Sequence, residues 1–145
     1  MQDVETTPLA QARINDFALH SYEKLRYADT DRQGHVNNAV FASILETGRV
    51  ELLYNPDRPL ADEQCSFVIA RLTLDLHAEI TWPGRVDIGT RAARIGRSSI
   101  TLEQGLFQNG QRAATASTVI VHVNDQTRRS QALSAIARQV FASLF

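Results

Sequence analysis

The strongest constraint on the fold is one long amphipathic segment followed by an almost unbroken run of strand-like segments. Residues 39–54 carry apolar side chains at helical spacing, so the sequence predicts a helix there. Asn37 or Asn38 can cap its first turn, and the Asn-Pro pair at 55–56 stops it. Gly48 inside this helix indicates a close approach to neighbouring backbone. Because the apolar face is broad, we expect the helix to be buried against a sheet.

The segments around this helix alternate between apolar and polar side chains, as β-strands do. Residues 17–27 alternate loosely ahead of the helix. After it we expect strands starting at 67–69, with a half-buried alternation over 72–78, and then at 86–95, 100–107 and 113–123. Asn109-Gly110 is a strong hairpin signal, and Ser130 can cap a last helix. One long helix before consecutive antiparallel strands is an α+β arrangement.

Length and composition place the chain among ordinary globular domains. At 145 residues it has the size of one domain, and we expect an N-terminal leader over 1–16 and the domain over 17–145. The net charge of −1 offers no basic surface for nucleic acid. No apolar run has the length of a membrane span. Cys65 is the single cysteine, and the start of the chain does not read as a signal peptide, so we expect a cytoplasmic protein.

Polar chemistry is concentrated where a loop meets the start of the predicted helix. Two acids, a glycine, a histidine and two asparagines fall within residues 29–38. Backbone N–H groups at a helix N-terminus lack intrahelical partners, and the helix dipole adds partial positive charge there. Such a place can hold a carboxylate beside a polarised carbonyl group, which acyl transfer requires.

This stretch closely resembles the D-x-D-x-x-G-H-V-N-N-x-x-[YF]-x-x-x-x-E-x-x-R signature of hotdog-fold acyl thioesterases of the 4-hydroxybenzoyl-CoA thioesterase type. Positions 29 to 49 fill the pattern, and weaker blocks at 82–84, 95–99 and 119–125 follow in the same order. The resemblance implies a hotdog fold, in which an antiparallel sheet wraps around one long central helix. It further implies hydrolysis of acyl-CoA to free acid and CoA by a homodimer or a dimer of dimers, with active sites shared across the subunit interface.

The same resemblance assigns catalytic roles within the loop. It makes Asp31 the catalytic carboxylate, acting as nucleophile or as general base, and the residues leave that choice open. It suggests that His35 is a general base or holds a water, and that the backbone N–H of Asn38 polarises the thioester carbonyl. Without a catalytic role, Asp31 reads as an acid that organises the loop through an Asx-turn. Asp29 is expected to be a turn or packing acid.

Further residues carry expectations about substrate and metal. By resemblance, Arg97 and Ser98 bind the CoA nucleotide, where arginine suits phosphate; acyl carrier protein is a less favoured substrate handle. Glu46 is expected to be a structural partner of Arg49 at i+3 or, as the less favoured alternative, a polar group near the acyl pocket. No cofactor or metal is expected, because the histidines at 77 and 122 lie in separate strand patterns without clustered ligands.

Two other functions remain open from the sequence. A hotdog dehydratase or hydratase would share the fold, but the H-V-N-N block argues against it. A non-catalytic protein that binds acyl thioesters would also share the fold. Asp31 disfavours such a binder, because binding alone has no need of that acid.

Overall fold

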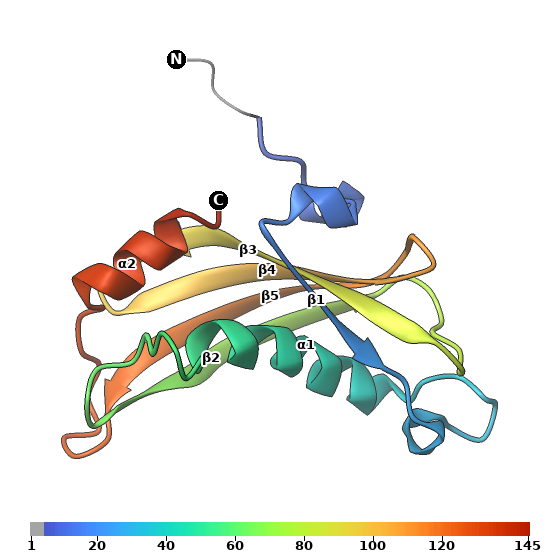
Figure 1. Ribbon diagram of the computed structural model, residues 1–145, viewed down its shortest axis with the longest axis horizontal. Helices are drawn as coiled ribbons and strands as arrows, with labels where there is room; N and C mark the ends of the chain where they lie inside the picture. Colours follow the sequence, from blue (N-terminus) through green and yellow to red (C-terminus); the bar gives the residue numbers. More distant parts are fainter. Residues whose placement is uncertain (1–4) are drawn as a thin grey trace.

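The computed structural model describes residues 5–145, which combine strands and helices in the order expected from the sequence (Figure 1). In chain order the main elements are β1 (Leu19–Lys24), α1 (Asn38–Leu53), β2 (Cys65–Leu76), β3 (Arg85–Ile95), β4 (Ser99–Gln108), β5 (Gln111–Asn124) and α2 (Ala135–Ala142). Short 3-10 turns lie at Leu9–Gln11, Ile14–Asp16 and Tyr27–Asp29. No helix within 5–145 is long and apolar enough to cross a membrane. The α+β class is confirmed.

The strands form one antiparallel sheet in the order β1-β3-β4-β5-β2. The strands β3, β4 and β5 follow one another as hairpins. Asn109 and Gly110 connect the last two with φ angles of 52° and 79°. Positive φ at both central residues is typical of the tight turn that suits the twist of a hairpin. The expected hairpin at Asn109-Gly110 is therefore confirmed.

The sheet curves around α1, which runs along its concave side (Figure 1). Asn37 is the N-cap of this helix, and its Oδ1 accepts a hydrogen bond from the Ala39 N–H at 2.9 Å. A Cβ atom at Gly48 would lie 2.8 Å from Ile88 Cγ2 and 2.9 Å from Gln104 Nε2. A close approach at this glycine is therefore present, but side chains of β3 and β4 make it rather than the neighbouring backbone that the sequence indicated. A sheet wrapped around one central helix is the hotdog fold.

The two ends of the chain pack on the sheet at different places. The short helix α2 lies beside the part of β3 that β1 does not reach, where the Ala92 N–H donates to the Leu144 carbonyl at 2.9 Å. Its N-cap is Ser134, whose Oγ accepts from the Ala137 N–H, so the cap expected at Ser130 is wrong. Of the expected leader, residues 1–4 lie outside the described part, and residues from Leu9 onward pack near Phe17.

Strand β2 forms one edge of the sheet and differs from its sequence-based description. The half-buried alternation predicted over residues 72–78 is not observed. Val68, Ile69, Leu72 and Leu76 are between 39% and 48% exposed. Within residues 5–145 no strand pairs with the outer side of β2, and its apolar side chains remain in water. An exposed apolar edge strand of this length is a surface suited to pairing with another chain.

Candidate active site

The loop before α1 is fixed by a network of backbone bonds. Thr30 pairs with Val36, and His35 pairs with Thr81 in the loop that leads to β3. Asp29 is buried; its Oδ2 accepts from the Arg26 backbone N–H at 2.8 Å and its Oδ1 from the Arg26 guanidinium at 2.9 Å. This carboxylate is therefore engaged in the turn itself, as the sequence suggests.

The carboxylate of Asp31 is held by one of its oxygens. Its Oδ1 accepts hydrogen bonds from the backbone N–H groups of Gln33, at 2.8 Å, and His35, at 3.2 Å. This is the Asx-turn arrangement that organises a loop. Its Oδ2 accepts no hydrogen bond from any residue between 5 and 145. One oxygen thus shapes the loop while the other is left for a ligand or water.

The first turn of α1 offers a backbone donor beside this carboxylate. Asn37 uses its own N–H on the Asp29 carbonyl, at 2.9 Å, and caps the helix with its side chain. The N–H of Asn38, at the first position of α1, has no acceptor among the described residues. It lies where the helix dipole contributes partial positive charge. An oxygen that gains negative charge during a reaction would be stabilised at this point.

His35 is paired with an acid that the sequence did not single out. Its Nε2 lies 3.0 Å from Oε2 of Glu79, in the segment after β2. The imidazole is only partly exposed and is oriented by this contact, while its Nδ1 makes no hydrogen bond to any described residue. Glu79 lies 44 positions further along the chain, and only the fold reveals the pair.

These groups line one cavity of about 380 Å³ at the N-terminal end of α1. Asp31, His35 and Asn38 all border it, so the fold brings together the three expected catalytic residues. The remaining lining residues come from the same loop, from α1 and from the end of β2: Gln33, Val36, Phe41, Leu76, His77, Ala78 and Glu79. A carboxylate, a free backbone donor and an oriented imidazole around an open cavity can activate water or attack a carbonyl carbon.

The expected nucleotide contacts lie elsewhere in the protomer. Arg97 and Ser98 occupy the turn between β3 and β4, at the far end of the sheet from the cavity. Strand β3 alone has 11 residues, which corresponds to about 33 Å. Both backbone carbonyls are used locally, that of Arg97 by the Leu133 N–H and that of Ser98 by the His122 N–H. Within one subunit, the structure does not bring these residues to Asp31.

Arg49 points into the core rather than toward Glu46. Its guanidinium Nη1 donates to Oε1 of Gln104 at 3.3 Å, and Arg49 is 4% exposed. Burial lowers the pKa of Arg49, and the Glu46 carboxylate partly offsets this by raising it. The expected Glu46–Arg49 ion pair is not among the ion pairs of the described residues, so that expectation is wrong. The gap that Gly48 leaves gives Gln104 room beside the helix.

A curved antiparallel sheet around α1, with a carboxylate loop at the start of that helix, defines the class of hotdog thioesterases. The model of the thioesterase-like superfamily matches residues 25–141, and the chain belongs to this family. The membership makes hydrolysis of an acyl thioester the general class of its reaction. Among curated protein sequences, no relative matches the chain.

Solved structures give the same result for the fold. The chain is similar to the PA5185 protein of Pseudomonas aeruginosa, with 27% identity and a TM-score of 0.82 over 91% of this chain and 94% of that one. A Thermus thermophilus thioesterase complexed with coenzyme A and Zn is 28% identical, with a TM-score of 0.74 over 88% and 93%. A predicted thioesterase of Bacillus stearothermophilus is 27% identical, with a TM-score of 0.77 over 86% and 94%.

Proposed function

We propose that this protein hydrolyses acyl-CoA thioesters in the cavity at the start of α1, with Asp31 as the reacting carboxylate. The observation that carries this proposal is that the two carboxylate oxygens of Asp31 have different hydrogen-bonding environments. Two backbone N–H groups hold Oδ1, whereas Oδ2 accepts nothing from the described residues. A carboxylate fixed in this way is pre-organised and still free to react, which lowers the entropic cost of reaching the transition state.

Asn38 supplies the second component of the proposal. Its backbone N–H is free at the N-terminus of α1 and borders the same cavity as Asp31. In the proposed mechanism this N–H donates to the thioester oxygen as that oxygen becomes negative. One donor of this kind is typically worth about 100-fold to 1000-fold in kcat. The role belongs to the backbone, so the Asn38 side chain need not take part.

The proposal keeps two routes for Asp31. As nucleophile, its Oδ2 attacks the carbonyl carbon, the C–S bond breaks with release of CoA thiolate, and water then hydrolyses the acyl–Asp anhydride. As general base, Oδ2 takes a proton from water while that water attacks the carbonyl directly. A single turnover in oxygen-labelled water separates them. Label in the Asp31 carboxylate supports the first route, and label in the product acid alone supports the second.

His35 is proposed to hold or activate the attacking water. Its Nε2 contact with Glu79 orients the ring, and Nδ1 has no hydrogen-bond partner among the described residues, so it is available to a water molecule in the cavity. A histidine oriented by a carboxylate is a common arrangement for proton transfer. Glu79 is then a positioning residue, because it acts through the imidazole rather than on the substrate.

A homodimer, or a dimer of dimers, is part of the proposal because it would complete the site. Antiparallel pairing of the exposed β2 edges of two subunits would place the Cys65 end of one beside the Leu76 end of the other. The turn with Arg97 and Ser98 lies at the Cys65 end, two strands away from β2, or about 10 Å. The partner's turn would thus approach the cavity from the side that lacks a nucleotide contact in one subunit.

Coenzyme A is the proposed substrate handle, with acyl carrier protein as the less favoured one. The Thermus thermophilus neighbour, which is complexed with coenzyme A, supports this choice. The cytoplasmic location expected from the sequence remains part of the proposal.

Release of free thiol from a panel of acyl-CoAs of different chain length and aromaticity tests the function. We expect turnover of at least one member and loss of that turnover in Asp31→Asn. Tight binding of an acyl-CoA without thiol release would instead indicate a non-catalytic binder. Addition or loss of water on an enoyl thioester, with the thioester intact, would indicate a hydratase or dehydratase.

A further inference from the structure

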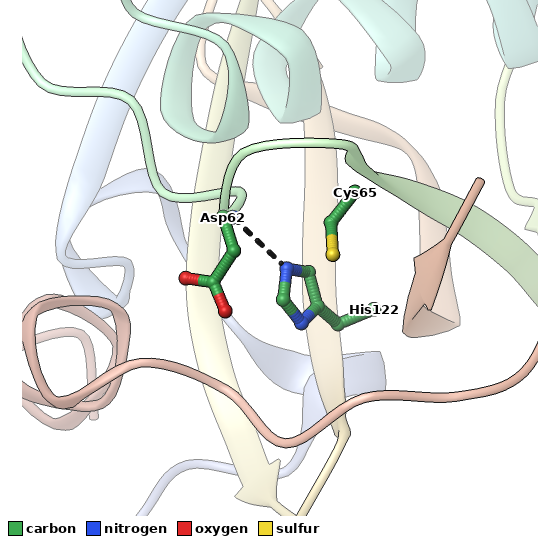
Figure 2. A group of neighbouring side chains, drawn as sticks. All are labelled: Asp62, Cys65 and His122. Carbon is green, nitrogen blue, oxygen red and sulfur yellow. Dashed lines mark hydrogen bonds between the residues drawn. The ribbon is translucent and has the colours of Figure 1, made fainter. Parts of the chain in front are cut away.

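A second group of reactive side chains lies far from the cavity. Asp62 and Cys65 come from the turn that opens β2, and His122 comes from the C-terminal end of β5 (Figure 2). One ligand atom from each, a carboxylate oxygen, Sγ and a ring nitrogen, lies within 4.8 Å of the others. His122 is fully buried, and the other two are half-buried. Sequence spacing conceals this group, because 57 positions separate Cys65 from His122.

The tautomer of His122 follows from its hydrogen bonds. Its Nδ1 lies 3.0 Å from the Gln131 carbonyl oxygen. A carbonyl can only accept, so Nδ1 carries the proton and Nε2 carries a lone pair. That lone pair accepts the Asp62 backbone N–H at 3.1 Å, the bond drawn in Figure 2. A histidine with Nδ1–H on a backbone carbonyl and an unprotonated Nε2 has the tautomer of a metal ligand, once Nε2 gives up the Asp62 N–H.

The carboxylate of Asp62 is oriented by the same residue. Its Oδ2 accepts a hydrogen bond from the Gln131 side-chain amide at 2.8 Å. Gln131 therefore orients both the imidazole and the carboxylate, the way outer-shell residues support ligands of a metal ion. The other oxygen of Asp62, Oδ1, accepts no hydrogen bond from the described residues.

The electrostatics of the cluster suit a cation. The carboxylates of Asp62 and Asp125 both lie near the Cys65 thiol. Within residues 5–145, no lysine or arginine forms an ion pair with either carboxylate. The Asp125 carboxylate accepts a hydrogen bond from Ser66 Oγ at 2.8 Å. Because this donor is neutral, it does not compensate the negative charge of the carboxylate. A divalent ion would neutralise these charges.

We propose that Asp62, Cys65 and His122 form a binding site for a thiophilic divalent cation of the zinc type. The ligands would be Asp62 Oδ1, Cys65 Sγ and His122 Nε2, with water in a fourth position. Sulfur, imidazole nitrogen and carboxylate oxygen are the zinc donors in proteins. The site is independent of the thioesterase chemistry and would tie the turn before β2 to β5 and to the segment around Gln131.

Binding requires a small local adjustment. Zinc holds sulfur at about 2.3 Å and nitrogen or oxygen at about 2.0–2.2 Å, so tetrahedral ligands lie roughly 3.5 Å apart. The ligand atoms lie within 4.8 Å of one another, so the widest separation must shrink by at most roughly an ångström. Nε2 of His122 also exchanges the Asp62 N–H for the ion. Both changes are confined to the turn at residues 62–65.

The test uses the untagged full chain and zinc alone, measured by equilibrium dialysis against a chromogenic chelator. We expect one ion per chain, and at least a tenfold loss of affinity in both Cys65→Ala and Asp62→Asn. His20→Gln, which removes an exposed histidine on β1, is the matched control and should bind as the parent does. Circular dichroism of each variant verifies folding, and Asp62→Asn retains an oxygen for Gln131.

Cobalt provides a second readout that a folding defect cannot imitate. The parent should show a thiolate-to-cobalt absorption band, and Cys65→Ala should lack it while keeping its fold. Zinc should also raise the melting temperature of the parent and leave that of Cys65→Ala unchanged. The proposal is overturned if the parent binds less than one ion. It is also overturned if Asp62→Asn binds as tightly as the parent, because the Asp62 carboxylate would then contribute nothing to zinc binding.

Discussion

Exchanging the Asp31 carboxylate for an amide separates its two suggested roles, because the two oxygens do different work. In Asp31→Asn the amide oxygen can still accept hydrogen bonds from the backbone N–H groups of Gln33 and His35. In the parent these nitrogens lie 2.8 Å and 3.2 Å from Oδ1 of Asp31. The loop should therefore keep its shape. The substitution removes the negative charge and the nucleophilic oxygen. A catalytic carboxylate is worth about 100-fold to 10,000-fold in rate, so we expect kcat to fall by at least 100-fold.

Asp31→Ala should add a structural defect to the same loss of activity. It removes both hydrogen bonds, each worth about 0.5–1.5 kcal/mol. Because Asp31 is exposed, the lower values apply, and the free energy of unfolding should drop by about 1 kcal/mol. For a chain of this size that corresponds to a fall of about 2–4 °C in melting temperature. Asp31→Asn should stay within about 0.5 kcal/mol of the parent, the range of ordinary surface substitutions.

Thiol release from an acyl-CoA measures the rate, and urea unfolding measures the stability. Asp57→Asn, which changes an exposed acid in the loop after α1, is the matched control and should leave both unchanged. Activity of Asp31→Asn within a few-fold of the parent would refute the assignment. A similar stability loss in the asparagine and alanine variants would refute the argument that Oδ1 alone shapes the loop.

Three further predictions address the nucleotide contact, the dimer and the core. Arg97→Ala should raise KM for acyl-CoA with nearly unchanged kcat, and it should not affect turnover of an N-acetylcysteamine thioester. The control Arg13→Ala should change neither constant, and equal effects of Arg97→Ala on both thioesters would exclude a nucleotide contact. Light scattering should give a dimer or larger even-numbered assembly, weakened by Leu72→Arg, and a monomer at micromolar concentration would contradict the edge pairing. Gly48→Ala should lower the free energy of unfolding, measured by urea denaturation, by about 1–2 kcal/mol, because overpacking outweighs the gain in helix propensity. Unchanged stability would mean that the neighbouring side chains rearrange to admit the methyl group.

The expectations that held rest on local physical chemistry. A 3.6-residue apolar period with an asparagine cap specifies α1 within its own segment, and Asn109-Gly110 specifies a hairpin through backbone conformation. The cost of glycine in a helix indicates tight packing at Gly48, although side chains rather than backbone make the contact. Residues Asp29 to Asn38 are contiguous in the sequence, so they necessarily lie near one another in the fold.

The expectations that failed depend on the tertiary neighbours of a segment rather than on the amino-acid pattern within it. Alternation over residues 72–78 indicates a strand but not its place at the sheet edge, which exposes Leu72 and Leu76. Ser130 and Ser134 are both chemically able to cap α2, and packing of the helix beside β3 decides between them. Arg49 and Glu46 have the spacing of an ion pair, but the guanidinium donates instead to Gln104, which is packed against Gly48.

The sequence by itself determined the class of fold and the position of the reactive loop, because both are encoded in neighbouring residues. Only the tertiary structure decided which distant groups meet. It paired His35 with Glu79 at 3.0 Å and gathered Asp62, Cys65 and His122 from the turn before β2, from β2 and from β5. It also separated Arg97 from Asp31 by the length of the sheet. Strand register and sheet order set these distances, and both arise from side-chain packing across the whole core, which no local pattern records.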